Sequence, residues 1–277
     1  MPVMLTGETS IDYDVRGKGP PLILIGGLGF GRWSWFRQVP ALSRHFRTVT
    51  FDVRGERRLR EGVPDLTADV LALMDHLNIP RAHVLGSSLG GFVAQELALE
   101  RPERVDRLVL IGTSAGRGSP MTMSPRALLD MAGWPGLDGE RAVRRGLETA
   151  TSASYRRRNP DEFEQLVRWR MADSPSAAAY YDQLRAGARF DSSRRLDRIT
   201  APALVIHGTE DRYVPPANGA ALAEGIPDAR LRLLDDAGHL VFIERFGAVN
   251  REITTFLKKT GKRTRCPSSR RRSRQIS

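Results

Sequence analysis

Short apolar runs alternate with longer segments of helical period along most of the chain. Several of these runs are nearly continuous in Leu, Ile and Val, as expected for strands that are covered on both faces. The strands predicted in this way are residues 11–15, 21–25, 47–52, 82–86, 107–111, 203–207 and 230–234. Strands of this kind, separated by helical segments, predict an α/β fold in which helices connect parallel strands.

Three segments between or after the strands place their apolar residues on one helical stripe. They are residues 66–77, 92–100 and 248–257. In the first of them the stripe is formed by Leu66, Val70, Leu73, Met74 and Leu77. We therefore predict that these three segments are helices packed against the sheet.

Residues 117–198 interrupt this alternation. They are rich in Arg and aromatic residues and contain no convincing strand, whereas helices are predicted near 124–132, 139–150, 160–172 and 176–187. We interpret residues 117–198 as a helical cap inserted into a single core domain. That core domain is predicted to consist of residues 1–116 and 199–260.

The charge of the chain is concentrated at one end. The 277 residues include 43 Lys and Arg against 32 Asp and Glu, which gives a formal net charge of +11. Residues 258–277 hold nine of the basic residues and no acidic one, so residues 1–257 carry 34 basic against 32 acidic residues. The tail, residues 261–277, is expected to be disordered and has no aromatic residue for base stacking. A nucleic-acid partner is therefore not favoured.

The sequence also disfavours a membrane-spanning protein, a secreted protein and a site built from cysteines. The sequence has no run of about 18 apolar residues that could form a transmembrane helix. Its first residues show neither a basic leader nor an apolar signal core, so a cytoplasmic location is expected. The single cysteine, Cys266, excludes an internal disulfide and a cysteine-based metal cluster.

Two segments match the pattern Gly-x-Ser-x-Gly, at residues 86–90 and 112–116. The first lies between a predicted strand and a predicted helix, which is the setting that a nucleophilic serine on a sharp turn requires. The second is followed by Arg117-Gly118-Ser119-Pro120, which cannot begin a helix promptly. Ser88 is thus the candidate nucleophile, and Ser114 is interpreted as a loop residue.

A serine nucleophile needs a base, and that base needs an orienting acid. His239 and Asp211 each follow the carboxyl end of a predicted strand, and the order Ser88, Asp211, His239 is the one expected for a sheet of this kind. Glu210 is an alternative to Asp211 as the orienting acid, but it lies one position too close to the end of the strand. His207 is expected to pack or to bind loop backbone instead.

An acyl-transfer reaction also needs donors for the developing oxyanion. The backbone N–H of Leu89 follows the serine, and that of Leu28 lies in the glycine-rich loop 26–31. The same loop could cradle a phosphate, but neither a Gly-x-Gly-x-x-Gly run nor a phosphate-loop lysine is present. We assign Leu28 and Leu89 to the oxyanion hole.

Apolar residues near these positions are candidates for a substrate pocket. They are Phe30, Trp33, Leu240 and Val241, together with the cap aromatics. Arginines of the cap could bind a carboxylate on the substrate, but Arg is the general basic residue of this chain. A surface position is therefore favoured for any single cap arginine.

Taken together, these motifs resemble those of the α/β-hydrolase superfamily over residues 9–257. The chain is similar to small bacterial carboxylesterases, 3-oxoadipate-type enol-lactonases and cofactor-free haloperoxidases. The segments 51–55 and 202–215 also resemble a strand-end turn and an acid-bearing strand of that superfamily. Gly26-Gly27 departs from the usual His-Gly, and residues 56–61 depart from the usual glycine-rich turn.

The resemblance implies an eight-stranded, mostly parallel sheet with a helical cap. It also implies hydrolysis of a small-molecule ester or lactone through an acyl-enzyme, with no metal or organic cofactor. The alternatives are an enol-lactone hydrolase, a cofactor-free haloperoxidase or perhydrolase, and a non-catalytic hydrolase-like binding protein. The last is disfavoured because Ser88, Asp211 and His239 are all present.

Overall fold

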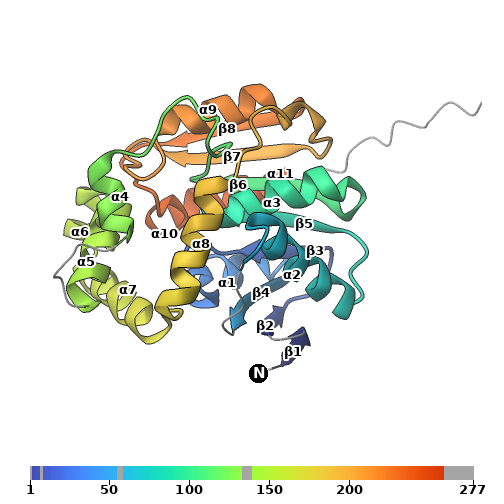
Figure 1. The fold of residues 1–277 in the computed structure, drawn as a ribbon, viewed down its shortest axis with the longest axis horizontal. Coiled ribbons are helices and arrows are strands. Elements are labelled where there is room, and N and C mark those ends of the chain that lie inside the picture. The colour runs from blue at the N-terminus through green and yellow to red at the C-terminus, as the bar shows by residue number, and fades with distance from the viewer. Residues whose placement is uncertain (1, 7–8, 55–58, 133–138, 259–277) are drawn as a thin grey trace, which may run out of the picture.

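The computed structural model describes residues 2–6, 9–54, 59–132 and 139–258. One eight-stranded sheet runs through the molecule in the order β1-β2-β4-β3-β5-β6-β7-β8 (Figure 1). The strands are β1 (Val3–Thr6), β2 (Thr9–Arg16), β3 (Pro21–Ile25), β4 (Arg47–Arg54), β5 (Ala82–Ser87), β6 (Val105–Ile111), β7 (Ala203–Gly208) and β8 (Ala229–Leu234). The pairs β1–β2 and β2–β4 are antiparallel, and all other pairs are parallel. The predicted eight-stranded, mostly parallel α/β sheet is confirmed.

The helices occupy the connections between the strands. They are α1 (Val39–Leu42), α2 (Val63–His76), α3 (Leu89–Glu100), α4 (Pro125–Ala132), α5 (Gly139–Ala150), α6 (Ala153–Arg158), α7 (Pro160–Ala172), α8 (Ala177–Arg189), α9 (Pro216–Gly225), α10 (Val241–Glu244) and α11 (Phe246–Lys258). Every helix predicted from the sequence is present within a few residues of its expected bounds. Among the described helices, none is long and apolar enough to cross a bilayer.

Alternating side chains of the central strands pack into two hydrophobic cores, one on each face of the sheet. Ile23 and Ile25 of β3 pack with residues of α2, α3 and α9. Leu22 and Leu24 of the same strand pack on the other face with residues of α1, α10 and α11. Because successive side chains of a strand point to opposite faces, a strand covered on both sides must be apolar throughout. Both cores together fix the carboxyl ends of the parallel strands.

The helices α4 to α8 all lie between β6 and β7 in the chain. In Figure 1, α4 to α7 gather at the left of the sheet, and α8 runs back toward it. We use the name cap for residues 117–198, the division that the sequence proposes. Leu147, Tyr155 and Leu166 of the cap helices are buried in the core on the α10–α11 face, so the cap packs directly on the sheet domain. The predicted disordered tail, residues 261–277, lies outside the described residues.

Candidate active site

Ser88 stands on a sharp turn between the end of β5 and the start of α3. Its backbone has φ 53° and ψ −118°, a conformation that is costly for any residue with a side chain. The turn is also tightly packed. A Cβ atom at Gly86 would overlap the carbonyl oxygen of Gly90, and one at Gly90 would overlap that of Ile25. The glycines of this motif are therefore required for the strand, the turn and the helix to approach one another.

The second serine motif has a different local structure. Ser114 Oγ accepts a hydrogen bond from Gly116 N at 3.1 Å, within a loop that follows β6. Gln95 Nε2 donates to the Ser114 carbonyl at 2.9 Å. These contacts give Ser114 a structural role in joining α3 to the loop.

Asp211 and His239 are brought together from the loops after β7 and β8. The distance between His239 Nδ1 and Asp211 Oδ2 is 2.8 Å, and both side chains are buried. Asp211 Oδ1 accepts hydrogen bonds from the backbone N–H groups of Tyr213 and Val214 at 2.9 and 2.8 Å. The Tyr213 ring also packs edge-on against the imidazole of His239. The carboxylate can thus hold one tautomer of the histidine, with the proton on Nδ1.

The ionisation of Asp211 is set by two opposing effects. Complete burial acts to raise the pKa of its carboxyl group, but the charge of His239 and hydrogen bonds from His207 and His239 outweigh burial and lower that pKa to about 2. His207 Nε2 lies 3.2 Å from Asp211 Oδ2 and 2.9 Å from the Val214 carbonyl oxygen. The acid therefore stays ionised in its buried position.

Ser88 and His239 line one cavity of about 390 Å³ beneath the cap. The loop 26–31 covers the serine, because a Cβ atom at Gly27 would lie 3.3 Å from Ser88 Cβ and 3.9 Å from Ser88 Oγ. Much of the remaining wall comes from cap residues, including Met131, Val143 and Leu147. A largely apolar cavity with a few polar groups is typical of a small-molecule site.

The four predicted pocket residues divide into two groups. Phe30 and Leu240 line the cavity, whereas Trp33 and Val241 do not. The Trp33 ring packs between Phe30 and Trp169, with ring centroids 5.3 and 6.0 Å away. Val241 begins α10 and is fully buried in the core. Sequence proximity to the loops was not enough to place these two side chains in the pocket.

Sequence reasoning missed several residues of the cavity wall. Tyr213 follows the candidate acid by two positions, and that short spacing could have indicated it. Asp130 and Arg170 come from two cap helices, and nothing in their local sequence distinguishes them from surface residues, whereas the cap aromatic Tyr180 does line the cavity as expected. Their position depends on how the cap folds over the sheet.

The predicted oxyanion donors lie on either side of Ser88. Leu89 is the first residue of α3, where the N–H groups have no partner within the helix. Within the described part of the chain, the structure gives neither the Leu28 N–H nor the Leu89 N–H a hydrogen-bond acceptor. Both amides remain available to a developing negative charge, which the start of a helix also favours.

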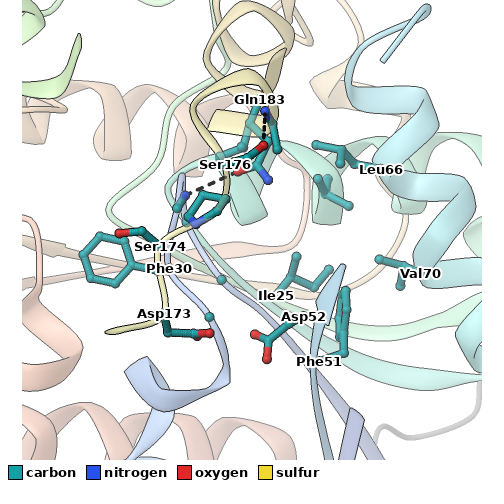
Figure 2. Close-up of a pocket in the computed structure, with 18 residues that line it drawn as sticks. Ile25, Phe30, Phe51, Asp52, Leu66, Val70, Asp173, Ser174, Ser176 and Gln183 are labelled. Atoms are coloured by element: carbon teal, nitrogen blue, oxygen red, sulfur yellow. Dashed lines mark hydrogen bonds between the residues drawn. The ribbon is translucent and has the colours of Figure 1, made fainter. Parts of the chain in front are cut away.

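A second cavity, of about 250 Å³, is also lined by residues of the loop 26–31 (Figure 2). One wall is apolar and includes Leu66 and Val70 of α2. The opposite wall holds Asp173 and Gln183, and Gln183 Oε1 accepts a hydrogen bond from Gly29 N at 3.3 Å. This contact links α8 to the loop that carries Leu28. No group of three potential metal ligands occurs among the residues that the structure describes.

Comparisons with known proteins agree with this architecture. Residues 20–246 match the family described as the alpha/beta hydrolase fold. The chain belongs to the α/β-hydrolase family. This α/β hydrolase is similar to the enol-lactonase from Burkholderia xenovorans LB400, with 31% identity and a TM-score of 0.81 over 93% of this chain and 100% of that one.

Two curated relatives match over similar lengths. A poly(3-hydroxyalkanoate) depolymerase of Ectopseudomonas oleovorans is 32% identical, covering 92% of this α/β hydrolase and 91% of the relative. A 2-hydroxy-6-oxononadienedioate/2-hydroxy-6-oxononatrienedioate hydrolase of Pseudomonas putida is 30% identical, covering 91% and 92%. The named activities of these relatives differ, whereas their likeness to this chain extends over nearly its whole length.

Proposed function

We propose that this α/β hydrolase cleaves carboxylic esters through an acyl-enzyme, with Ser88 as nucleophile, His239 as base and Asp211 as orienting acid. One observation carries the proposal. The buried hydrogen bond of 2.8 Å between His239 and Asp211 belongs to a histidine that lines the same cavity as Ser88, at the turn between β5 and α3. This arrangement can remove a proton from a serine hydroxyl and hold the resulting imidazolium.

The steps follow from the positions of these groups. Ser88 Oγ attacks the ester carbonyl while His239 Nε2 accepts the hydroxyl proton, and Asp211 stabilises the charged ring. The amides of Leu28 and Leu89 donate to the tetrahedral oxyanion, and each such donor is worth about 3–4 kcal/mol at comparable sites. His239 then protonates the leaving alkoxide and activates a water molecule, which releases the acid product and restores Ser88.

Replacement of Ser88 by Ala tests this proposal. We expect Ser88→Ala to lower the turnover of p-nitrophenyl esters by about 10³-fold or more, because no other group forms the acyl-enzyme. Ser114→Ala is the matched control, since Ser114 belongs to the second serine motif and its Oγ accepts a hydrogen bond from Gly116 N of its own loop. Equal rates for Ser88→Ala and the wild type, or an equal loss in both variants, would contradict the proposed mechanism.

The likeness to a solved enol-lactonase supports a second candidate, the opening of a lactone by the same residues. The chemistry differs in that the leaving oxygen, an alkoxide from a saturated lactone or an enolate from an enol-lactone, stays attached to the acyl group. A panel of p-nitrophenyl esters of increasing acyl length, beside saturated lactones and an enol-lactone, distinguishes the two. A preference for short neutral esters supports the esterase, and activity confined to the enol-lactone supports the second candidate.

A further inference from the structure

One basic side chain lies in the wall of the cavity that holds Ser88. Arg170, near the end of α7, is the only Lys or Arg among the described residues that line this cavity. Its guanidinium stacks near the rings of Phe30 and Tyr180, with Cζ 5.9 and 5.6 Å from the two centroids. Arg170 Nη1 donates a hydrogen bond to Ser174 Oγ at 2.8 Å. The charge is therefore held in place by aromatic rings and a hydroxyl group.

The guanidinium also contacts the loop that covers the nucleophile. A Cβ atom at Gly29 would lie 2.9 Å from Arg170 Cζ and would overlap Nη2. Gly27, two residues earlier, is the position at which a Cβ atom would touch Ser88. Because Cα atoms two residues apart are separated by at most about 7 Å, Arg170 and Ser88 face the same short segment of chain. One small substrate can reach both groups.

The acidic groups near the cavity are already engaged elsewhere. Asp130, the only acidic residue among the described residues of this wall, bonds to Arg145 Nε at 3.1 Å and to Thr149 Oγ1 at 2.6 Å. Asp173 lies in the wall of the second cavity, where its carboxylate points toward Asp52 (Figure 2). Within the described part of the chain, Arg170 forms no ion pair at 4 Å or less, although Asp173 favours its charge from a distance.

Burial makes the charge of Arg170 costly. It lowers the pKa of the guanidinium, and nearby Tyr180 and Asp173 oppose this effect only in part. An anion that entered the cavity would offset the cost of burial. A guanidinium matches a carboxylate in particular, because its N–H groups can donate to both oxygens at once.

We propose that Arg170 binds a carboxylate of the substrate, so that the preferred substrates are esters or lactones that carry a second, anionic carboxyl group. The inference rests on the proposed function, since it assigns the substrate class of the same site. It also reverses the expectation from the sequence that any single cap arginine lies at the surface. Arg168, two positions earlier on α7, does fit that expectation, because it is exposed and bonds to Gln165.

Matched pairs of esters test the assignment. Mono-p-nitrophenyl adipate and p-nitrophenyl hexanoate differ by a carboxylate at the end of the acyl chain, and 4-acetoxybenzoate and 4-acetoxybenzamide differ by one in the leaving group. The selectivity for the charged member is the ratio of the two kcat/KM values. It is measured for the wild type, Arg170→Gln, Arg170→Lys and the control Arg168→Gln, each with its melting temperature.

We expect the wild type to prefer the charged member of at least one pair. Arg170→Gln should lower this selectivity about 10–100-fold, mainly through KM, because a hydrogen-bonded ion pair with the substrate is lost. Arg170→Lys should keep part of the selectivity, and Arg168→Gln should keep all of it. Equal selectivity in the wild type, Arg170→Gln and Arg168→Gln would overturn the proposal.

A second measurement needs no variant and covers the case in which Arg170→Gln fails to fold. Adipate and hexanoate each offer one carboxylate to the oxyanion hole, but only adipate offers a second one to Arg170. We expect adipate to inhibit the wild type at least tenfold better than hexanoate, and equal inhibition would overturn the proposal. If the wild type hydrolysed none of the esters or lactones, the proposed function itself would fail, which is a different result from a loss of selectivity.

Discussion

His207 lies fully buried beside the candidate catalytic acid. Its Nε2 atom approaches two acceptors, the Val214 carbonyl oxygen at 2.9 Å and Asp211 Oδ2 at 3.2 Å, so the ring proton belongs on Nε2. Nδ1 of the same ring has no hydrogen-bond partner in the described structure. Asp211 thereby receives imidazole donors from two histidines and N–H donors from two backbone groups. This set of donors explains how a carboxylate without solvent contact stays charged.

This arrangement predicts how acid affects the stability of the protein. Because the pKa of Asp211 is lower in the folded chain than its ordinary value of 3.8, its carboxylate stabilises the fold above about pH 4, and this contribution is lost as the pH falls to about 2. We expect Asp211→Asn to lower the free energy of unfolding by about 2 kcal/mol near pH 7 and by progressively less below about pH 4. Urea unfolding at a series of pH values measures this difference.

The control for this experiment is a carboxylate paired at the surface. Asp75 lies 2.6 Å from Arg104 with 68% of its side chain exposed, so Asp75→Asn should leave the free energy of unfolding close to that of the wild type at every pH. A difference between Asp211→Asn and the wild type that stayed constant from pH 7 to pH 2 would show that Asp211 does not act through its charge.

Individual site residues were predictable where local rules decide their position. Ser88, Asp211 and His239 follow strand ends, and the carboxyl ends of parallel strands meet at one edge of the sheet. Arg170 had no such signal, because the local sequence around a half-buried arginine on a helix resembles that around an exposed one. The burial of Arg170 depends on Tyr180 and on the loop that contains Gly29, both distant in the sequence.

At the scale of elements, the cap is joined to the loop that carries the candidate base. Glu244 Oε1 accepts from Gly238 N at 2.9 Å, and its Oε2 accepts from Ser152 N at 3.1 Å. Next to these contacts, Leu240 N donates to the Ala150 carbonyl oxygen at 3.0 Å. One half-buried carboxylate and one backbone hydrogen bond thus hold the corner between α5 and α6 against the segment around His239.

Replacement of Glu244 by Gln should loosen this unit. Burial raises the pKa of Glu244, and the hydrogen bonds from Ser152 and Gly238 oppose it, whereas an amide could accept from only one of these donors well. Losing a hydrogen bond to a charged group costs about 1.5–3 kcal/mol, so we expect a melting temperature lower by about 5 °C. Because Gly238 precedes His239, kcat should fall by about fivefold or more.

Glu252→Gln provides the comparison for this variant. Glu252 lies on α11 and forms a largely exposed pair with Arg232 at 3.2 Å. The melting temperature and the kcat of Glu252→Gln should both match those of the wild type. A Glu244→Gln enzyme with unchanged kcat would show that the cap contact does not position His239.

Elements with a strong apolar period were predictable, and weakly patterned ones were not. Seven of the eight strands were predicted, whereas β1 was missed because Val3 and Leu5 of this short edge strand are exposed. The helix α6 was missed because it buries only Tyr155 and has no apolar stripe. The order of the strands was not predictable from the apolar pattern. That pattern identifies each strand but not its neighbours, and β3 lies between β4 and β5 in the sheet.

At the scale of the whole molecule, charge is unevenly distributed along the chain. The cores and cavities described above are formed by residues within 2–258, the part of the chain that the structure describes with short gaps. Of the net charge of +11, residues 1–257 carry two units. Residues 258–277 carry the other nine units. Among the described residues, Arg170 supplies the positive charge in the wall of the cavity that holds Ser88.

Removal of residues 261–277 tests this separation. The deletion takes away seven Lys and Arg residues and no acidic residue. We expect ester kcat/KM to stay within about twofold of the wild type at every ionic strength. The described residues that line the candidate site lie outside the deleted segment, and salt screens the interaction of exposed charges with a distant substrate. Retention on a cation exchanger should fall sharply in the same protein, which verifies the change in charge. A large loss of kcat/KM at low salt alone would instead assign the tail a role in attracting the substrate.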